Sequence, residues 1–370
     1  MSKRHLFFIL FIAIAFLIAS GVPTNSLNSG QASNSDFSLS AGRNVNMVSG
    51  DKLPGGDPWL QRQNEPSIAV SSRNPLHLLA GANDYRTVDM PISEGDLPGK
   101  TPTAMVGDAW LGVFKSYDGG ESWASTMLPG FPQDPNVNPL KNYRTAADPV
   151  VRSGPNGLFY YSGIAFNRDT NLGVVFVARF IDNNDKEGGD TIQYIDTKII
   201  ASGTATKFLD KPWFAVDQPR IPFGYVTIAG QKIPRHNVYI AYSAFSGQGA
   251  ALVGDIMFAR SNDCGTTWGT PLKISTANCA NQGATIAIKP VIGEVLVAWR
   301  QFANTNKKSK SPDAIFVAHS LSRGLNFQSP VKVANVPPFD QPTTDETQSL
   351  PGTGLGFAFR TNSYPAIRSL

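Results

Sequence analysis

Four acidic residues stand at the ends of apolar segments, where a carboxyl group could transfer protons. Three of them, Glu65, Asp148 and Asp210, come one or two residues before a proline that opens an apolar stretch, and the fourth, Asp84, comes shortly after such a stretch. Carboxyl groups held at the ends of strands are suited to general acid–base chemistry. We predict Asp84 and Asp148 as the first candidates, with Asp210 and Glu65 behind them. The alternative is that Asp148 and Asp210 only bond backbone groups where their strands begin.

Four arginines directly follow an aromatic residue and could contact an anionic group. A guanidinium group binds a carboxylate through two parallel hydrogen bonds and keeps its charge near neutral pH. Arg300 and Arg360 come first, because each stands at the end of an apolar strand or just before the start of a repeated unit. The full set is Arg86, Arg144, Arg300 and Arg360. The alternative is that these are surface arginines stacked on aromatic rings.

The sequence offers no pattern for metal or cofactor chemistry. Its four histidines stand at positions 5, 77, 236 and 319, without the spacing of metal ligands. Neither the Gly-x-Ser-x-Gly elbow of serine hydrolases nor the Gly-x-x-x-x-Gly-Lys phosphate loop is present. We therefore predict no metal and no cofactor.

A repeated turn marks the strands that must position these side chains. The segments 116–123 and 261–268 both read Ser-x-Asp-x-Gly-x-Ser/Thr-Trp, and 320–327 is a weaker copy with serine for the aspartate and phenylalanine for the tryptophan. An aspartate in a tight turn can accept hydrogen bonds from nearby backbone N–H groups, and the glycine can adopt positive φ. We predict a structural role for the residues of the two full copies, namely Ser116, Asp118, Gly120, Trp123, Ser261, Asp263, Gly265 and Trp268.

A second pattern, a proline or glycine followed by two apolar strands, recurs four times ahead of an outer hairpin. It begins near residues 66, 149, 212 and 283, and a fifth start is visible at 363–368. The second unit lacks the aspartate turn and has an acidic loop instead. Four-stranded units in series are typical of β-propeller blades. The sequence thus predicts an all-β fold, a β-propeller of four-stranded blades, with about four blades and the start of a fifth in this chain.

The first 50 residues predict export. Basic residues precede an unbroken apolar run at 6–19, and small residues follow it, which is the layout of a secretory signal peptide. The run is shorter than the ~20 residues that a membrane-spanning helix needs, although an uncleaved anchor is the alternative. We assign 1–21 to the signal peptide, 22–50 to a flexible leader and 51–370 to the propeller. We expect a secreted or periplasmic protein with no membrane contact after cleavage.

The net charge bears on the class of partner, and the two cysteines raise the question of a disulfide. The net charge of +4 comes from charges scattered along the chain, so we expect no nucleic-acid partner. Export would bring Cys264 and Cys279, the two cysteines, into an oxidising compartment in which a disulfide could persist. A straight strand between them would separate the pair too far for a bridge. A loop that folds back would allow one, so both alternatives stay open.

The repeated turn resembles the Asp-box, or bacterial neuraminidase repeat, and residues 65–370 are similar to the sialidase superfamily of six-bladed β-propellers. The resemblance implies that the turns lie on outer hairpins, on the face opposite the active site. It also implies a site in which three arginines bind the substrate carboxylate, an aspartic acid is the general acid and base, and a tyrosine paired with a glutamate is the nucleophile. Arg86, Arg144, Arg300 and Arg360 would supply the arginines, and Asp84 or Asp148 the acid.

Two departures from the family pattern keep other functions open. An Arg-Ile-Pro element belongs before the first blade, whereas here 220–222 lies inside the third unit. The nucleophilic tyrosine belongs to a final blade beyond this chain, which we expect to be truncated at its C-terminus. The main hypothesis is a secreted sialidase-like glycoside hydrolase (exo-α-sialidase type) acting on anionic sugars, with a glycan or glycoconjugate as its partner. The alternatives are a non-catalytic propeller that binds glycan or protein, and a neutral-polysaccharide glycosidase with two facing carboxylates.

Overall fold

The chain is represented by a computed structural model, which describes residues 43–48, 63–87, 108–170, 172–185, 189–218, 222–247, 251–276, 279–289, 293–303, 313–336, 347–349, 356–358 and 364–368. The expected signal peptide, most of the expected leader and Arg360 lie outside these residues. Across the described ranges, no helix is long and apolar enough to cross a membrane. Their regular structure consists of strands and two short 3-10 turns, η2 (Tyr85–Thr87) and η4 (Pro155–Gly157).

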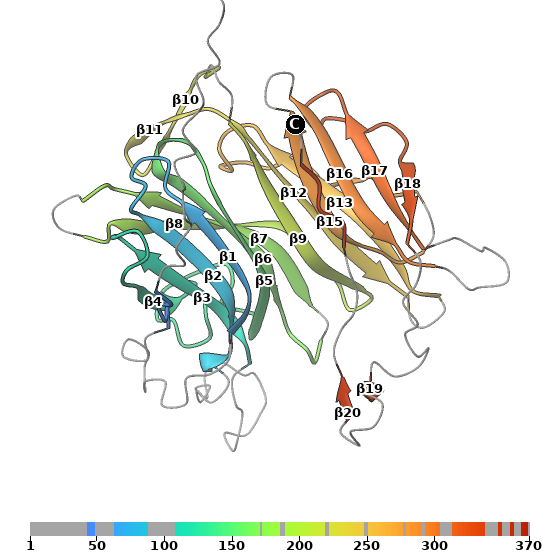
Figure 1. Ribbon diagram of the computed structural model, residues 1–370, viewed down its shortest axis with the longest axis horizontal. Helices are drawn as coiled ribbons and strands as arrows, with labels where there is room; N and C mark the ends of the chain where they lie inside the picture. Colours follow the sequence, from blue (N-terminus) through green and yellow to red (C-terminus); the bar gives the residue numbers. More distant parts are fainter. Residues whose placement is uncertain are drawn as a thin grey trace, which may run out of the picture. The chain divides into compact units, whose positions relative to one another are not determined.

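Four antiparallel sheets of four strands each follow one another along the sequence, as the colours of Figure 1 show. The first contains β1 (Gln63–Val70), β2 (Leu78–Asp84), β3 (Trp110–Ser116) and β4 (Ala124–Met127). The second contains β5 (Thr145–Ser153), β6 (Leu158–Phe166), β7 (Gly173–Asp182) and β8 (Ile192–Ser202). The third contains β9 (Lys207–Asp217), β12 (Asn237–Ser246), β13 (Val253–Ser261) and β14 (Leu272–Lys273). The fourth contains β15 (Asn281–Lys289), β16 (Glu294–Gln301), β17 (Ala314–Ser320) and β18 (Val331–Asn335).

The all-β class and the four-stranded units predicted from the sequence are therefore confirmed. Two small hairpins were not predicted: β10 (Tyr225–Ile228) pairs with β11 (Gln231–Pro234) between β9 and β12, and β19 (Thr347–Ser349) pairs with β20 (Gly356–Ala358). The described part of the expected fifth unit, 364–368, forms no strand. Its first residue nevertheless contacts the fourth sheet, as described below.

Apolar cores lie between successive sheets. Neighbouring residues on one strand point to opposite faces, so Tyr161 of β6 enters the core shared with the first sheet and Tyr160 enters the core shared with the third. In the third sheet, Ile240 and Tyr239 divide in the same way between the second and fourth sheets. A strand with a core on both faces is apolar at almost every position, which explains why all ten residues of β7 are buried.

The first strands of the sheets lie next to one another. β1 contacts β5, β5 contacts β9, and β9 contacts β15. Sheets that pack face to face with their first strands adjacent have the arrangement of β-propeller blades, in which the first strand of each blade lies innermost. Side chains at the starts of these four strands can therefore meet, although they are far apart in sequence.

The repeated turn has the hydrogen bonds that its spacing predicts. Asp263 accepts hydrogen bonds from Ser261 Oγ at 2.7 Å, from the Thr267 backbone N–H at 2.9 Å and from Thr267 Oγ1 at 2.6 Å. Asp118 makes the corresponding contacts in the first sheet. In the weaker copy Ser322 occupies the aspartate position and accepts a backbone hydrogen bond at 3.2 Å. Each turn is thus closed by its own side chains.

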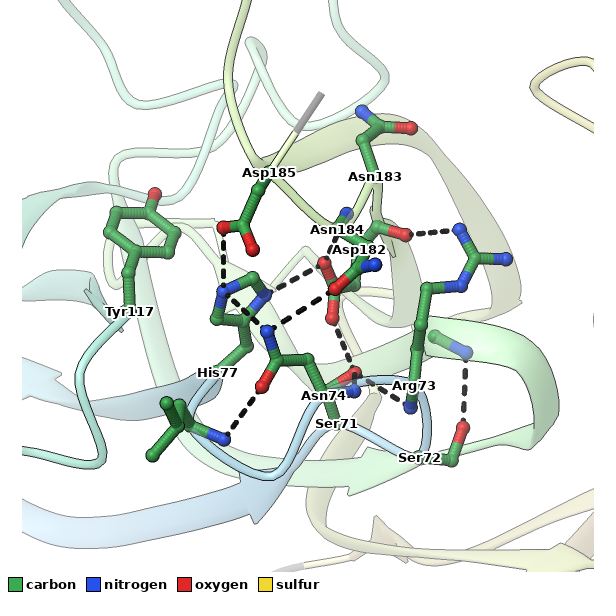
Figure 2. Close-up of polar contacts among 12 residues, drawn as sticks. Ser71, Ser72, Arg73, Asn74, His77, Tyr117, Asp182, Asn183, Asn184 and Asp185 are labelled. Atoms are coloured by element: carbon green, nitrogen blue, oxygen red, sulfur yellow. Dashed lines mark hydrogen bonds and ion pairs between the residues drawn. The ribbon is translucent and has the colours of Figure 1, made fainter. Parts of the chain in front are cut away.

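The second sheet, which lacks the aspartate turn, is joined to the first by a polar junction (Figure 2). His77, just before β2, lies with Nδ1 2.9 Å from Asp182 Oδ1, and Ser71 Oγ donates to Asp182 Oδ2 at 2.5 Å. Arg73 donates to the Asp182 backbone oxygen at 2.9 Å, and Asp185 lies 3.2 Å from His77 Nε2. His77 and Asp182 are both buried. Their contact connects the first sheet to the second.

Both cysteines are buried, and neither forms a disulfide. Cys264 lies in the turn of the third sheet, where Sγ is 3.3 Å from His236 Nδ1. Burial raises the pKa of the Cys264 thiol to about 11, so the group is protonated near neutral pH. Of the two alternatives left open by the sequence, the structure contains the unbridged pair.

Replacing Asp263 by alanine should destabilise the fold, because the donors of the turn lose their acceptor. We expect urea unfolding to give a free energy of unfolding lower by about 1–3 kcal/mol. Asn262→Ala, in the same turn, is the matched control and should change stability little. Equal stabilities for the two variants would contradict a structural role for the carboxylate.

The pH dependence of that effect follows from the pKa of Asp263. Partial burial alone would raise this pKa, but the hydrogen bonds from Thr267 and Ser261 outweigh burial and lower it. A lowered folded pKa gives stability that is present above the unfolded pKa and is lost as the pH falls through the folded value. The stability difference between the native protein and Asp263→Ala should therefore shrink in acid.

Candidate functional site

The first strand of each four-stranded sheet contains the same bulge. In β1 the pairing register shifts between Asn64 and Ser67, so that Glu65 and Pro66 together oppose one residue of β2. Such a bulge bends the strand and redirects a side chain. The equivalent pairs in the other sheets are Asp148–Pro149, Lys211–Pro212 and Gly283–Ala284.

The first residue of each bulge has a positive φ angle. The values are 53° at Glu65, 60° at Asp148, 48° at Lys211 and 70° at Gly283. Glycine adopts this conformation freely, whereas an L-residue with a side chain pays roughly 1–2 kcal/mol. Three successive sheets thus hold a charged residue where glycine would be less strained. Strain concentrated at one place suggests a functional site.

These bulges line a single pocket of about 510 Å³. This volume lies within the range of small-molecule sites. The polar and aromatic residues of its wall include Glu65, Asp148, Arg152, Lys211, Trp213 and Tyr364. The wall is therefore assembled from all four first strands, together with the segment 364–365.

Hydrogen bonds connect one bulge to the next. Asn83 Oδ1 accepts the Asp148 backbone N–H at 2.9 Å, and Asp148 Oδ2 accepts the Lys211 backbone N–H at 3.1 Å. The Lys211 ammonium then reaches back to Glu65, with Nζ 3.1 Å from Oε2. At the second and third bulges the strained backbone N–H is thus held by a side chain of the preceding sheet, which keeps the bulge in its conformation.

A second set of contacts continues to the fourth sheet. Gln282 Nε2 donates to Asp210 Oδ2 at 2.6 Å, and the Tyr364 hydroxyl donates to Gln282 Oε1 at 2.8 Å. The Gln282 amide is therefore oriented from both ends.

The Asp148 carboxyl keeps its proton more strongly than an ordinary aspartic acid. Its side chain is only 13% exposed. Burial, the neighbouring Asp210 carboxylate and a hydrogen bond with Glu65 raise the pKa of Asp148 well above its usual range, against the opposing effect of Lys211. The carboxylates of Asp148 and Glu65 in turn outweigh burial and raise the pKa of Lys211. The site therefore combines a carboxylic acid, a carboxylate and an ammonium group.

Asp84 and Arg86 are paired with each other. Arg86 Nη2 lies 2.6 Å from Asp84 Oδ2 and its Nε lies 2.9 Å from both carboxylate oxygens. Both side chains are fully buried, and Asp84 does not line the pocket. A buried ion pair of this kind is costly to break. The structure therefore does not bring Asp84 together with Asp148.

The other predicted arginines that the structure describes also have carboxylate partners. Arg144 Nη2 lies 3.0 Å from Asp169 Oδ2, and Arg300 Nη2 lies 2.6 Å from Asp313 Oδ2. Neither arginine lines the pocket. Arg360 lies outside the described residues. Of the sequence candidates, the structure brings together Glu65, Asp148 and Asp210.

Three further pocket residues, Lys211, Trp213 and Tyr364, and the neighbouring Gln282 were not selected from the sequence as functional. One sequence signal could have found Lys211, Gln282 and Tyr364. Each of these three stands at or beside the residue that precedes the proline or alanine of a repeated unit. That position lines the pocket in all four of the four-stranded sheets.

The aspartate turns lie at the other end of the sheets. Gln63 at the start of β1 is paired with Asp84, which in turn is paired with Trp110 at the start of β3. The bulge opposes Ala82, which pairs with Gly112, whereas the turn begins at Ser116, the last residue of β3. The turns are therefore not part of the pocket.

No protein-family model and no curated protein matches the chain. Among solved structures, an α-L-arabinofuranosidase from Fusarium graminearum is 14% identical with a TM-score of 0.42, over 73% of this chain and 66% of that one. A Hadza microbial sialidase is 14% identical with a TM-score of 0.40, over 72% and 46%. A leech intramolecular trans-sialidase is 12% identical with a TM-score of 0.41, over 79% and 53%. The match thus spans between about half and two thirds of those chains.

If the bulge is strained, glycine at its first position should be tolerated better than a β-branched residue. We expect Glu65→Gly to be more stable than Glu65→Val by about 2 kcal/mol in urea unfolding, since valine adopts positive φ with difficulty. Both variants lose the same carboxylate, so each controls for the other. Equal stabilities would show that the backbone at this position is not constrained.

Asp148→Asn should make the fold more stable at neutral and alkaline pH. A raised folded pKa means that stability falls with rising pH between the unfolded pKa, near 3.9, and the raised folded value. Asparagine removes this loss because it resembles the protonated acid in shape and charge. The urea stabilities of the two proteins should agree below about pH 4 and diverge above it. Parallel curves would contradict the raised pKa.

Proposed function

We propose that the chain is a glycoside hydrolase in which Asp148 is the general acid. The observation that carries this proposal is the raised pKa of Asp148 in a pocket of small-molecule size. Glycoside hydrolysis needs one carboxyl group that keeps its proton, to protonate the leaving oxygen, and a second that is ionised. We assign the second role to Asp210, which precedes the pocket residue Lys211 and accepts the Gln282 hydrogen bond.

In this proposal Glu65 and Lys211 influence the pKa of Asp148 and do not react with the sugar. The Glu65 carboxyl is hydrogen-bonded to Asp148, and after burial and Asp210 this contact helps to raise the pKa of Asp148. Lys211 lies 3.1 Å from Glu65 and 3.9 Å from Asp148. Its ammonium opposes the raised pKa of Asp148 without cancelling it.

The described pocket wall has few of the groups that bind an anionic sugar. Its ammonium group, on Lys211, is already paired with Glu65. Of the arginines predicted to bind a sugar carboxylate, Arg86, Arg144 and Arg300 are each paired with a carboxylate elsewhere, and Arg152 is the one guanidinium among the described lining residues. We therefore propose a neutral glycoside as the substrate class.

A sialidase-type activity on anionic sugars is the second candidate, and one observation favours it. Arg152 lines the pocket, with its guanidinium 4.9 Å from the centre of the Trp213 ring. Stacked in this way, an arginine can still offer N–H groups to a carboxylate. Under either activity we infer from residues 1–21 that the chain is exported and meets its glycan outside the cytoplasm.

The test is an assay of the native protein on neutral aryl glycosides beside an aryl sialoside. Asp148→Asn should lower kcat on phenyl glycosides by about 10²–10⁴-fold. It should lower kcat far less on dinitrophenyl glycosides, whose leaving group needs no proton. Asp169→Asn, which changes an aspartate outside the pocket, is the control. Loss of activity on both leaving groups would contradict the acid role.

The assay also separates the remaining alternatives. Turnover of the sialoside with sensitivity to Arg152→Ala would support the second candidate. A folded protein that turns over no glycoside would leave the non-catalytic binding propeller.

A further inference from the structure

Tyr364 occupies a place that a side chain fills in the other three sheets. Gly283 stands at the bulge position held elsewhere by Glu65, Asp148 and Lys211. A Cβ atom at position 283 would overlap the Tyr364 ring and lie 2.8 Å from its Cβ. The absence of a side chain at Gly283 therefore lets the Tyr364 ring lie against the backbone of the fourth sheet.

The ring is also held at its far end. Its hydroxyl donates to Gln282 Oε1 at 2.8 Å, and the Gln282 amide is fixed in turn by Asp210 at 2.6 Å. A tyrosine that packs on a glycine and hydrogen-bonds to an oriented amide has little freedom to move aside. Together with Pro365 it forms a rigid part of the pocket wall.

We propose that Tyr364 determines the size of the ligand that the pocket accepts. The claim rests on the proposed function for the nature of the ligand, but the position of the ring does not depend on it. Asp148 and Lys211 line the same pocket and are fixed by their bulges. A substitution at Tyr364 therefore changes the wall without changing the Asp148 side chain.

The seating of the ring can be tested by a double-mutant cycle. Gly283→Ala should lower the urea midpoint strongly in the native background, because the new methyl group displaces the ring. The same change should lower it less in a protein that already carries Tyr364→Ala, where only the strain of positive φ remains. Additive effects of the two substitutions would overturn the proposal, since the ring would then not lie on Gly283.

Ligand size is tested with phenyl and naphthyl glycosides, whose leaving groups have similar acidity. Tyr364→Ala should shift the ratio of kcat/KM toward the naphthyl compound by at least about tenfold. Tyr364→Phe is the matched control, because it keeps the ring and removes only the hydroxyl, and it should preserve the native ratio. An unchanged ratio in Tyr364→Ala would overturn the proposal.

A readout without turnover separates this claim from the proposed function. Trp213 lines the same pocket, and its fluorescence can be isolated by subtracting the spectrum of Trp213→Phe. Tyr364→Ala should increase quenching of that component by acrylamide, whereas Tyr364→Phe should not. If no glycoside is turned over but quenching increases, the proposed hydrolase activity is contradicted and the role of Tyr364 in the pocket wall is supported. If quenching is unchanged, the role of Tyr364 is contradicted whatever the activity.

Discussion

The pocket depends on one backbone constraint, the bulge in the first strand of each sheet. Two residues oppose one at Glu65–Pro66, Asp148–Pro149, Lys211–Pro212 and Gly283–Ala284, and the first residue of each pair has positive φ. This conformation is strained for a residue with a side chain. It is retained because side chains of neighbouring sheets accept the backbone N–H groups at the second and third bulges. Charged groups are thereby gathered in one place, where burial, together with the neighbouring Asp210 and Glu65, raises the pKa of Asp148.

Stability and chemistry are placed at opposite ends of the sheets. At one end, the aspartate turns close the outer hairpins, and the buried His77–Asp182 contact of Figure 2 joins the first two sheets. At the other end, the fold holds three strained, charged residues around a pocket. A stable scaffold is what allows such residues to persist. The same division explains why the conspicuous aspartates of the repeated turns are far from the pocket.

Much of the fold could be predicted from the sequence, because turns and strand periodicity are local properties. The aspartate turn at Asp263 and the four repeated units are examples. The meeting of Glu65, Asp148 and Asp210 followed from their common place at strand starts. The role of Lys211 could not be predicted, because the sequence does not reveal which residue of Asp210–Lys211 adopts positive φ. The partner of Arg300, thirteen residues away at Asp313, and the seat of Tyr364 on Gly283 are tertiary contacts that no local pattern encodes.

The central claim is that Asp148 retains its proton because its bulge buries the carboxyl group and holds it beside Asp210 and Glu65. The most direct measurement is a carbon-13 NMR titration of the aspartate carboxyl groups, with Asp148→Asn to assign the signal. The account predicts one aspartate that titrates well above the usual range near 3.9 and disappears in the variant. It also predicts that this pKa rises further in Lys211→Met, because the opposing ammonium is removed. An Asp148 that titrates at the ordinary value would contradict the account.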